Sequence, residues 1–515
     1  MPIYHPHYSG ATIDKRNFDF VPSHRSGNAA VRESWDLLTR RMRWALDNTY
    51  MVKRAVRMTT QLVVESGIHA FFAGLPDVHN SDEAANLLEH PLYLFGEESD
   101  QSWERWADRY ADVSRRRSLY EMQATSVAEL FGTGNSLWLR VIRPAPDGVC
   151  PVAWELLEAE QLDERHDRPA GRGQNRIDHG IEYNQYDEPV AYWLYDTHPH
   201  DSYAAVPLMG RSNRIPAERV VHLALTTRAS QDFGVSLYNI MLQPSHDEDW
   251  LVGHELTSAA LAAGLTLLIR EEEDEDGEVA FDTEATATTA PADFDESAGR
   301  PGVPNFESVG LGAGTIARLR GQKENVEVVE SKRPNKDMAP FVHFLINRAS
   351  MASSLSYHRF MGNPSGASFA ALRAMINDDR GMSEPLTRAV APKICGRQRE
   401  QHDSVQVALG RYRSVRPSDY RADPGTYQDY DLLGPPLRLL NPVEDVRAAQ
   451  SRIRSGLSTL RRECGLLGLN YRAVLKQLAV EARLSDALGV VLDFSAGGGS
   501  TPSRTTTASD SGGNE

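Results

Sequence analysis

The stretch "TYMVKRAVRMTTQLVVESG" at residues 49–67 sets the character of the chain. Apolar residues recur there at spacings of three and four, as on one face of a helix. That face holds Val52, Ala55, Val56, Thr59, Leu62 and Val63. Gly67 follows as a residue suited to the left-handed conformation in which many helices end. The pattern predicts a helix here, and residues 29–66 as a whole predict two helices.

Outward from this stretch, the period of the apolar pattern changes from helical to strand-like. Trp103, Trp106 and Tyr110 predict a third helix at 102–131, which the glycines at 132–134 end. Alternation with a period of two then predicts strands in "NSLWLRVIR" (135–143), "GIEYNQYDEPVAYWLY" (180–195) and "RIPAERVVHLAL" (214–225). The step at 187–189 predicts a turn. A helical beginning followed by a small β unit indicates an α+β fold.

The second half of the chain is mainly helical in pattern. Helices are predicted at 246–269, 336–354, 368–402, 458–466 and 470–487, with two short strands around Gly321. Pro385 and Pro392 are expected to break the helix at 368–402. Asn441 and Pro442 predict a further helix start, with Asn441 as the cap and Glu444 reaching back to it.

The negative charge of the chain is concentrated in one segment. The net charge is -16, and residues 271–310 hold 13 acids and one base, which gives -12 and leaves -4 for the rest. Six acids in a row follow an apolar stretch that ends at Arg270 and that we expect to finish a helix. The low apolar content predicts a disordered acidic insert at 271–308, and composition predicts a disordered tail at 491–515. An acidic total argues against tight, nonspecific duplex binding.

Bulk features exclude several classes of protein. No run of about 18 or more apolar residues is present, so we expect no membrane span. The first residues have no apolar core, so we expect no secretory signal. Cys150, Cys395 and Cys464 have no metal-ligand spacing, and free thiols in a reduced compartment are expected.

Local chemistry indicates no enzyme, cofactor or metal. "HPHYSG" at 5–10 and "HPHD" at 198–201 suggest a metal site, but no helical His pair supports it, and polar loops explain them better. The acid run lacks the alternation and turn glycine of a calcium loop. The glycines at 168–174 lack phosphate-loop spacing, and the Ser of "GVSLYNI" lacks the flanking glycines of a nucleophile elbow.

The order of these segments resembles the lambda-type portal proteins of tailed bacteriophages. The phrases that carry the resemblance are "DNTYMVKRAVRMTTQLVVESGI" (47–68), "GIEYNQYDEPVAYWLYDTHPHD" (180–201), "RIPAERVVHL" (214–223), "GVSLYNIML" (234–242), "HELTSAALAAGLTLLI" (254–269), "NPVEDVRAAQSRIRSGLSTLRREC" (441–464) and "GLNYRAVLKQLAVEARLSDALGV" (468–490). No single phrase is specific, but their order over most of the chain is. The chain departs from the family at Asn441, where an Asp is usual, and in its acidic insertion.

The resemblance implies a portal fold and a division of the chain. Its parts are an N-terminal arm at 1–28, a wing at 29–235, wing and stem helices at 236–269, a clip at 270–335, a second stem helix at 336–352, a tunnel loop at 353–367, a long helix returning to the wing at 368–437, and a helical crown at 438–490. The implied assembly is a dodecameric ring at one capsid vertex, the channel for genome packaging and ejection.

The resemblance also implies partners and site residues. Expected partners are further copies of the chain, double-stranded DNA without sequence specificity, the terminase large subunit, a head–tail adaptor protein and the major capsid protein. The expected location is the virion, with host cytoplasm during assembly and no membrane. The residues expected at the channel are Arg348, His358, Arg359 and Asn363. The residues expected to dock partners at the clip are Glu271, Glu272, Glu273, Asp274, Glu275 and Asp276.

Alternatives remain open at this point. Arg348 and Arg359 could instead pair with acids between subunits, and the acidic segment could be a tolerated insertion that binds nothing. The chain as a whole could be a capsid scaffold or adaptor outside the channel, or a metal-dependent hydrolase that uses His198 and His200.

Overall fold

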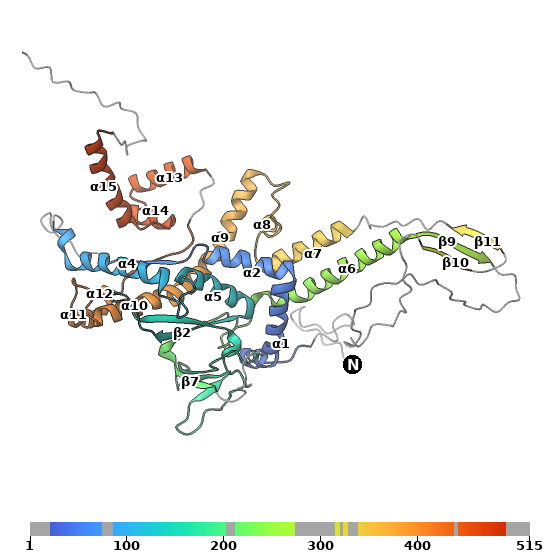
Figure 1. Ribbon diagram of the computed structural model, residues 1–515, viewed down its shortest axis with the longest axis horizontal. Coiled ribbons are helices and arrows are strands. Elements are labelled where there is room, and N and C mark those ends of the chain that lie inside the picture. Colours follow the sequence, from blue (N-terminus) through green and yellow to red (C-terminus); the bar gives the residue numbers. More distant parts are fainter. Residues whose placement is uncertain are drawn as a thin grey trace, which may run out of the picture.

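The computed structural model describes residues 21–74, 86–201, 212–272, 315–319, 323–327, 338–436 and 441–490. The early His-rich loop at 5–10, most of the acidic insert and the tail at 491–515 lie outside these residues. The chain is mixed α and β, with long helices and small sheets (Figure 1). No described helix has the length and apolar character that a membrane span requires.

The two helices predicted at the start are confirmed. They are α1 (Gly27–Asn48) and α2 (Tyr50–Val63). The Ser26 side chain accepts the N–H of Ala29 and so caps α1. On α2, the buried residues are Met51, Val52, Ala55, Val56, Thr59 and Val63, which is the expected face with Met51 added and Leu62 only partly buried. Because α2 packs against α5 and α9, its face joins distant parts of the chain.

The single helix predicted at 102–131 is wrong, because two helices occupy this region. They are α4 (Pro91–Arg109) and α5 (Leu119–Thr133). Between them the Asp112 carboxylate accepts the N–H groups of Ser114 at 3.1 Å and Arg116 at 3.0 Å, which stabilises a tight turn. Ser118 then starts α5 in a capping box with Glu121.

The end of α5 is where the sequence predicts it. Gly134 has a φ of 94°, a conformation that favours glycine. A Cβ at this position would lie 2.4 Å from the backbone of Val235, so a larger residue fits poorly here. This close approach brings the end of α5 against the segment that leads into α6.

Two antiparallel sheets follow. In the first, β2 (Asn135–Ile142) lies between β3 (Val152–Leu157) and β8 (Val220–Ala224). The second has the order β4 (Arg176–Asp178), β5 (Ile181–Tyr183), β6 (Pro189–Leu194) and β7 (Asn213–Pro216).

The strand predictions are confirmed in part. The pair at 180–195 and its turn are confirmed, with Asp187 at a φ of 58°. The strand predicted at 214–225 is instead two strands in different sheets. A 3-10 turn at Ala217–Arg219 separates them, directly after Pro216, which has no N–H to continue a ladder.

A paired-helix excursion leaves this body (Figure 1). The helix α6 (Leu242–Gly264) runs outward, and α7 (Met338–Ser353) runs beside it, with β9 (Leu265–Glu272), β10 (Thr315–Leu319) and β11 (Lys323–Glu327) at the far end. The strand β9 lies in the middle, parallel to β10 and antiparallel to β11.

The predicted end of the outgoing helix is wrong, and the two flanking strands are confirmed. The expected helix at 246–269 stops at Gly264, and the apolar stretch after it is β9. A short apolar run of this kind fits a strand or a helix equally well by pattern, and pairing on both sides decides for the strand. Pro244 also lies inside the first turn of α6, where proline is tolerated, rather than before the helix.

The return path begins with a short helix, α8 (Tyr357–Met361). A continuous helical run follows, made of α9 (Phe369–Ala391), a π-helical turn (Pro392–Gly396) and α10 (Arg397–Ala408). The predicted break at Pro385 is wrong because the helix passes through it, and Pro392 is accommodated by the π turn. After α11 (Pro417–Ala422) and α12 (Pro424–Tyr427), β12 (Tyr430–Leu433) pairs antiparallel with β1 (His69–Phe72).

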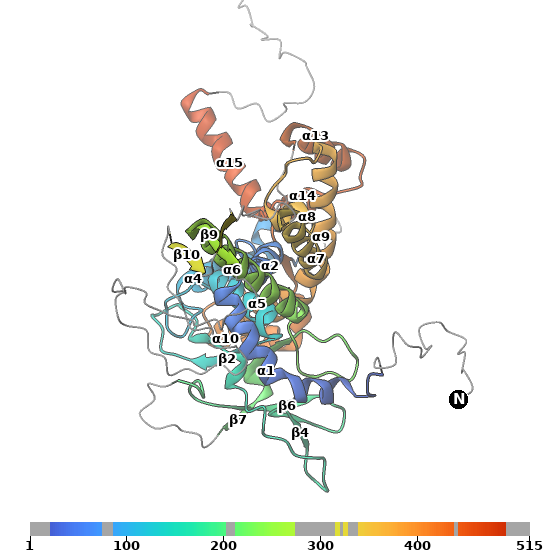
Figure 2. The same ribbon diagram turned by 90° about the vertical axis from the view of Figure 1, so that its right-hand side faces the viewer.

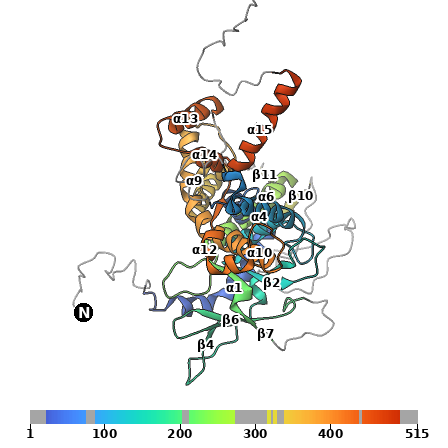
Figure 3. The ribbon, with the colours of Figure 1, turned by 90° about the vertical axis from the view of Figure 1, so that its left-hand side faces the viewer.

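Three C-terminal helices complete the described chain. They are α13 (Pro442–Arg454), α14 (Leu460–Leu466) and α15 (Tyr471–Leu488), close to prediction, and they lie on the side opposite the sheet of β4–β7 (Figures 2 and 3). Pro442 holds the first helical position as expected. The capping prediction is wrong in detail, since the Asn441 side chain makes no cap bond and Asp445, not Glu444, accepts the Asn441 N–H at 3.2 Å.

The core is aromatic. Trp103, Trp106, Trp138 and Trp154 are fully buried, which confirms that the tryptophans of α4 are core residues. The three cysteines are free and buried, as expected. Burial raises the pKa of Cys395 to about 12, so this thiol is unreactive at neutral pH.

A buried carboxylate joins the distant parts of this core. Asp403 on α10 is fully buried and accepts bonds from Arg399 (2.9 Å), His402 (2.9 Å), Ser99 (2.7 Å), Tyr412 (2.8 Å) and Tyr430 (2.9 Å). Burial alone would raise its pKa, but Arg399 and His402 hold the pKa below its ordinary value. The charge is therefore retained and ties α4, α10 and β12 together.

We predict that Asp403→Asn lowers the free energy of unfolding by about 3 kcal/mol or more, because Arg399 loses a buried partner. The pKa of Asp403 is below its ordinary value, so its stabilisation is present above roughly pH 4 and is lost as the pH falls. The difference between variant and parent in urea unfolding should shrink in acid. Exposed Asp108→Asn is the matched control, and equal loss in both variants would contradict the assignment.

Candidate functional site

The segment between α7 and α9 is the first candidate site, because it holds the residues expected at the channel. It contains α8 and the turn that follows it (Figure 2). The segment expected to be a loop, 353–367, is thus partly helical. Ser356 precedes α8, and Gly362 ends it at a φ of 70°.

A buried aspartate holds one end of α8. Asp379 on α9 is 2% exposed and accepts the N–H of Ser356 at 2.9 Å and its hydroxyl at 3.0 Å. Arg359 lies 3.6 Å from the same carboxylate. Arg359 is therefore paired within its own chain, and most of its charge is compensated.

An arginine of α2 holds the other end. Arg54 donates to the carbonyl of Phe360 and, at 3.1 Å, to the carbonyl of Arg359. A Cβ on Gly362 would lie 2.8 Å from the Arg54 guanidinium, so glycine gives this contact room. The last carbonyls of α8 thus find a cationic donor.

The remaining expected channel residues are separated into two places. His358 bonds through Nδ1 to the carbonyl of Asn363 at 2.9 Å, and the Asn363 side chain accepts the N–H of Ser365 at 3.0 Å. The structure therefore brings His358, Arg359 and Asn363 together in one turn. Arg348 lies on α7 at an exposed position, and no ion pair to a described residue is formed by it.

Sequence reasoning missed Arg54 and Asp379, the two residues that fix this turn. Arg54 precedes its acceptor Phe360 by 306 residues in the sequence. Asp379 follows another aspartate, Asp378, which is exposed. No local pattern marks either residue, and only the packing of α2 and α9 around α8 identifies them.

Of the expected docking acids, only two fall in the described part of the chain. Glu271 and Glu272 end β9, where their Cα partners on β11 are Glu324 and Lys323. Glu273, Asp274, Glu275 and Asp276 lie outside the described residues. The first two acids are therefore part of a strand rather than of a loop.

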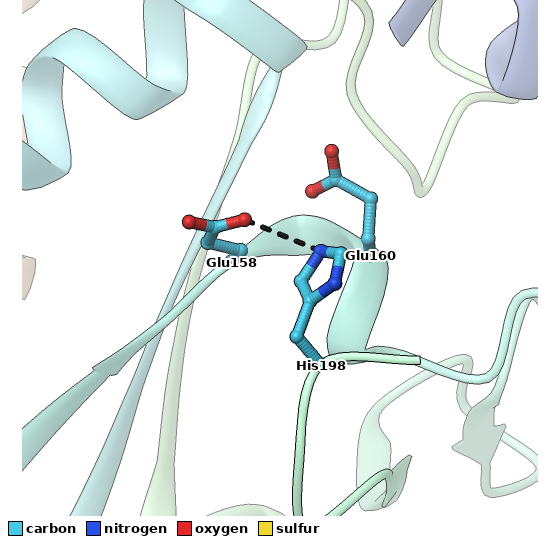
Figure 4. A group of neighbouring side chains, drawn as sticks. All are labelled: Glu158, Glu160 and His198. Atoms are coloured by element: carbon cyan, nitrogen blue, oxygen red, sulfur yellow. Dashed lines mark ion pairs between the residues drawn. The ribbon is translucent and has the colours of Figure 1, made fainter. Parts of the chain in front are cut away.

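One group in the sheet region has the composition of a metal site (Figure 4). Side-chain ligand atoms of Glu158, Glu160 and His198 lie within 4.8 Å of one another, and His198 is 3.3 Å from Glu158. Arg43 already makes two bonds of 2.8 Å to Glu160 and also bonds Glu129. Burial alone would lower the pKa of Arg43, but these carboxylates raise it.

This guanidinium argues against a metal reading of the group. It stays charged and supplies the cation that Glu160 needs, so a metal ion would face like charge. The His-rich loop at 198–201 does bring one histidine beside carboxylates, which its sequence could not indicate. His200 instead donates its N–H to His198 at 3.2 Å.

A second candidate surface lies along the paired helices. On α7, Phe341, Phe344 and Met351 are exposed with spacings of three and seven, and Arg348 falls on the same face. On α6, Trp250 is 62% exposed. Large apolar side chains gathered on one face of described helices mark a surface that another protein covers.

A comparison of the chain with protein families identifies the family to which it belongs. The family model described as phage portal protein, lambda family, matches residues 14–385. The chain belongs to the lambda family of phage portal proteins. This family is one of structural proteins, so the chain is not an enzyme. The family match contradicts the alternative that the chain is a hydrolase. The match ends at residue 385, before α10 and the C-terminal helices.

Individual relatives are distant. A probable portal protein of Halomonas phage phiHAP-1 is 25% identical over 353 residues, which are 68% of this chain and 62% of the relative. The chain thus spans about 62% of the length of that curated relative. Among solved structures, a chain in the neck of an empty GTA particle has a TM-score of 0.44 at 14% identity, covering 85% of this portal-family chain and 94% of its own. A chain in the virion of a native gene transfer agent particle has a TM-score of 0.44 at 13% identity, covering 86% and 98%.

We predict that Asp379→Asn loosens α8 and lowers the free energy of unfolding by about 2 kcal/mol, because hydrogen bonds to a buried charge are lost. Limited proteolysis should cut the segment 356–361 faster than in the parent. The neighbouring exposed Asp378→Asn is the control. Equal cleavage of both variants and the parent would show that Asp379 does not hold this turn.

Proposed function

We propose that the chain forms a ring of identical subunits at one vertex of a phage head, through which duplex DNA enters and leaves. The observation that carries this proposal is the uncovered apolar face of α7, with Phe344 at 55% and Met351 at 69% exposed. A surface of this kind favours burial against a further copy of the chain. A closed ring repeats one such contact around its axis.

The division of the chain follows from the same proposal. The body with α1–α5 and the sheets forms the wing, α6 and α7 form the stem, and β9–β11 form the clip. The segment 353–367 with α8 is the tunnel loop, and α13–α15 form the crown. A dodecamer is proposed from the family resemblance.

Passage of DNA requires a channel that does not hold phosphates tightly, since each phosphate contact adds affinity. Compensation of Arg359 by Asp379 suits this requirement. The His358 ring also bonds to the backbone carbonyl of Asn363 at 2.9 Å, which keeps this ring nitrogen within the turn. Arg348, on the apolar face of α7, fits the alternative role of pairing with an acid of the next subunit.

The proposed partners dock at two parts of the ring. The terminase large subunit and later a head–tail adaptor dock at the clip, and the major capsid protein surrounds the wing. The proposed location is the capsid vertex of the virion, after assembly in host cytoplasm. The alternative, a capsid scaffold or adaptor protein, is supported by no feature of the described residues that does not also fit a portal.

We predict that Phe344→Asp with Met351→Asp reduces ring formation at least tenfold, because charge replaces apolar contact between copies. Negative-stain images and sedimentation would count rings. Tyr186→Asp, which changes a 79% exposed side chain in the β5–β6 turn, is the control and should assemble as the parent does. Normal rings from the α7 variant would rule out this face as the subunit contact.

The docking role of Glu271–Asp276 is a separate proposal, supported by the charge of -12 in 271–310. Deletion of 273–300 keeps β9 and should weaken binding of terminase or adaptor, with a larger effect at low salt because exposed charges are screened. Binding assays at two salt concentrations would measure this. Identical binding by parent and deletion would support the alternative that the insertion is tolerated and binds nothing.

A further inference from the structure

The loop between α4 and α5 presents three consecutive arginines. Arg115, Arg116 and Arg117 are all exposed, in a part of the chain where both neighbouring helices are fixed by the core. The side chains of Arg116 and Arg117 make no ion pair with a described carboxylate at salt-bridge distance. An exposed cationic cluster on an acidic chain is a surface for an anionic partner.

The backbone of this loop is built to hold the arginines in place. The Asp112 carboxylate accepts N–H groups from Ser114, Arg116 and Arg117, at 3.1, 3.0 and 3.2 Å. These bonds lower the pKa of Asp112, against the raising effect of burial, so the carboxylate stays ionised. Its oxygens are directed at the backbone rather than at the guanidinium groups.

The residues that follow the end of β2 hold the loop from the other side. Arg115 donates to the carbonyl of Pro144 at 2.8 Å and stacks over Tyr110 at 5.4 Å. Arg143 donates to the carbonyl of Val113. These bonds satisfy backbone oxygens and neutralise no charge, so Arg143 adds a fourth cation beside the three of the loop.

The acids nearby do not cancel this charge. Glu121 is the closest to Arg117 in its electrostatic effect, and it is engaged with the Ser118 N–H at 2.7 Å. Glu155 is a third acid nearby, since it interacts electrostatically with Asp112. With Asp112, Glu121 and Glu155 set against four arginines, the cluster keeps a net positive charge. Its position in the wing is distant from β9–β11, since α4 and α5 lie toward the other end of the molecule (Figure 1).

We propose that Arg115, Arg116, Arg117 and Arg143 form a site on the wing for the sugar–phosphate backbone of duplex DNA, separate from the channel. The choice of DNA rests on the proposed function, in which duplex DNA enters and leaves through the ring that the wing helps to form. Guanidinium groups match phosphate oxygens with paired donors. DNA held at this surface leaves the channel free, so it does not hinder the passage of DNA through the ring.

The test uses the full chain, a fluorescent DNA duplex of about 30 base pairs, and the double variant Arg116→Ala with Arg117→Ala. Arg115 and Arg143 stay because they hold backbone carbonyls. Each phosphate contact adds about 0.9 to the slope of log binding constant against log salt. The variant should therefore lose about 1.8 in slope and roughly tenfold in affinity at 50 mM salt.

The matched control is Arg447→Ala with Arg454→Ala, two exposed arginines of α13 with no described ion-pair partner. It changes net charge equally and should bind DNA as the parent does. Equal losses in both variants, or none in either, would overturn the proposal. Ring formation by the Arg116 and Arg117 variant, checked by negative stain, separates failure of this site from failure of the portal function.

An acidic protein is the competing occupant, and a further variant distinguishes it. Ile142 is 66% exposed on β2, next to Arg143, and would contact a protein but not a phosphate. Ile142→Ser should leave DNA affinity unchanged. If a poly-glutamate peptide binds more tightly than the duplex, and Ile142→Ser weakens that binding, the site takes an acidic protein and the DNA proposal is wrong.

Discussion

The buried carboxylate of Asp403 is the constraint on which the rest of the structure depends. A charge without water must be met by hydrogen bonds, and the donors come from α4, α10, β12 and the loop at Tyr412. Arg399 also donates a bond of 2.8 Å to Asp100 on α4, so a second acid joins the network. Elements that are 300 residues apart in sequence are thereby fixed against one another, and in the folded chain the paired helices α6 and α7 extend from this body.

The sequence predicts what local periodicity controls and misses what distant partners control. The apolar face of α2 follows from spacing, because α2 buries one regular face. The strand β2 and the C-terminal helices are also predicted from local pattern. The break between α4 and α5 has local signals in Asp112 and Ser118, but the helical spacing of Trp103, Trp106 and Tyr110 before it conceals them. The first five residues of β9 are mostly apolar, so only its two neighbouring strands distinguish it from a helix.

The candidate site shows the same limit. Its expected residues His358, Arg359 and Asn363 do lie together, because they are close in sequence. The residues that position them, Arg54 and Asp379, come from helices on either side and carry no pattern of their own. Arg348 was grouped with them by position, while its place on the apolar face of α7 relates it to contact between copies. The exposed apolar groups of α7 and the pairing of Arg359 with Asp379 are the features on which the proposed assembly rests.

The pairing of β1 with β12 has a consequence for how the chain is made. His69 lies opposite Leu433, so the central core includes strands from both ends of the described body. During synthesis from the N-terminus, α4 and β1 emerge long before Asp403 and β12 can join them. The helices α6 and α7, with their exposed apolar side chains, also leave the ribosome before that core closes. A nascent chain therefore exposes these apolar side chains while its own core is unfinished.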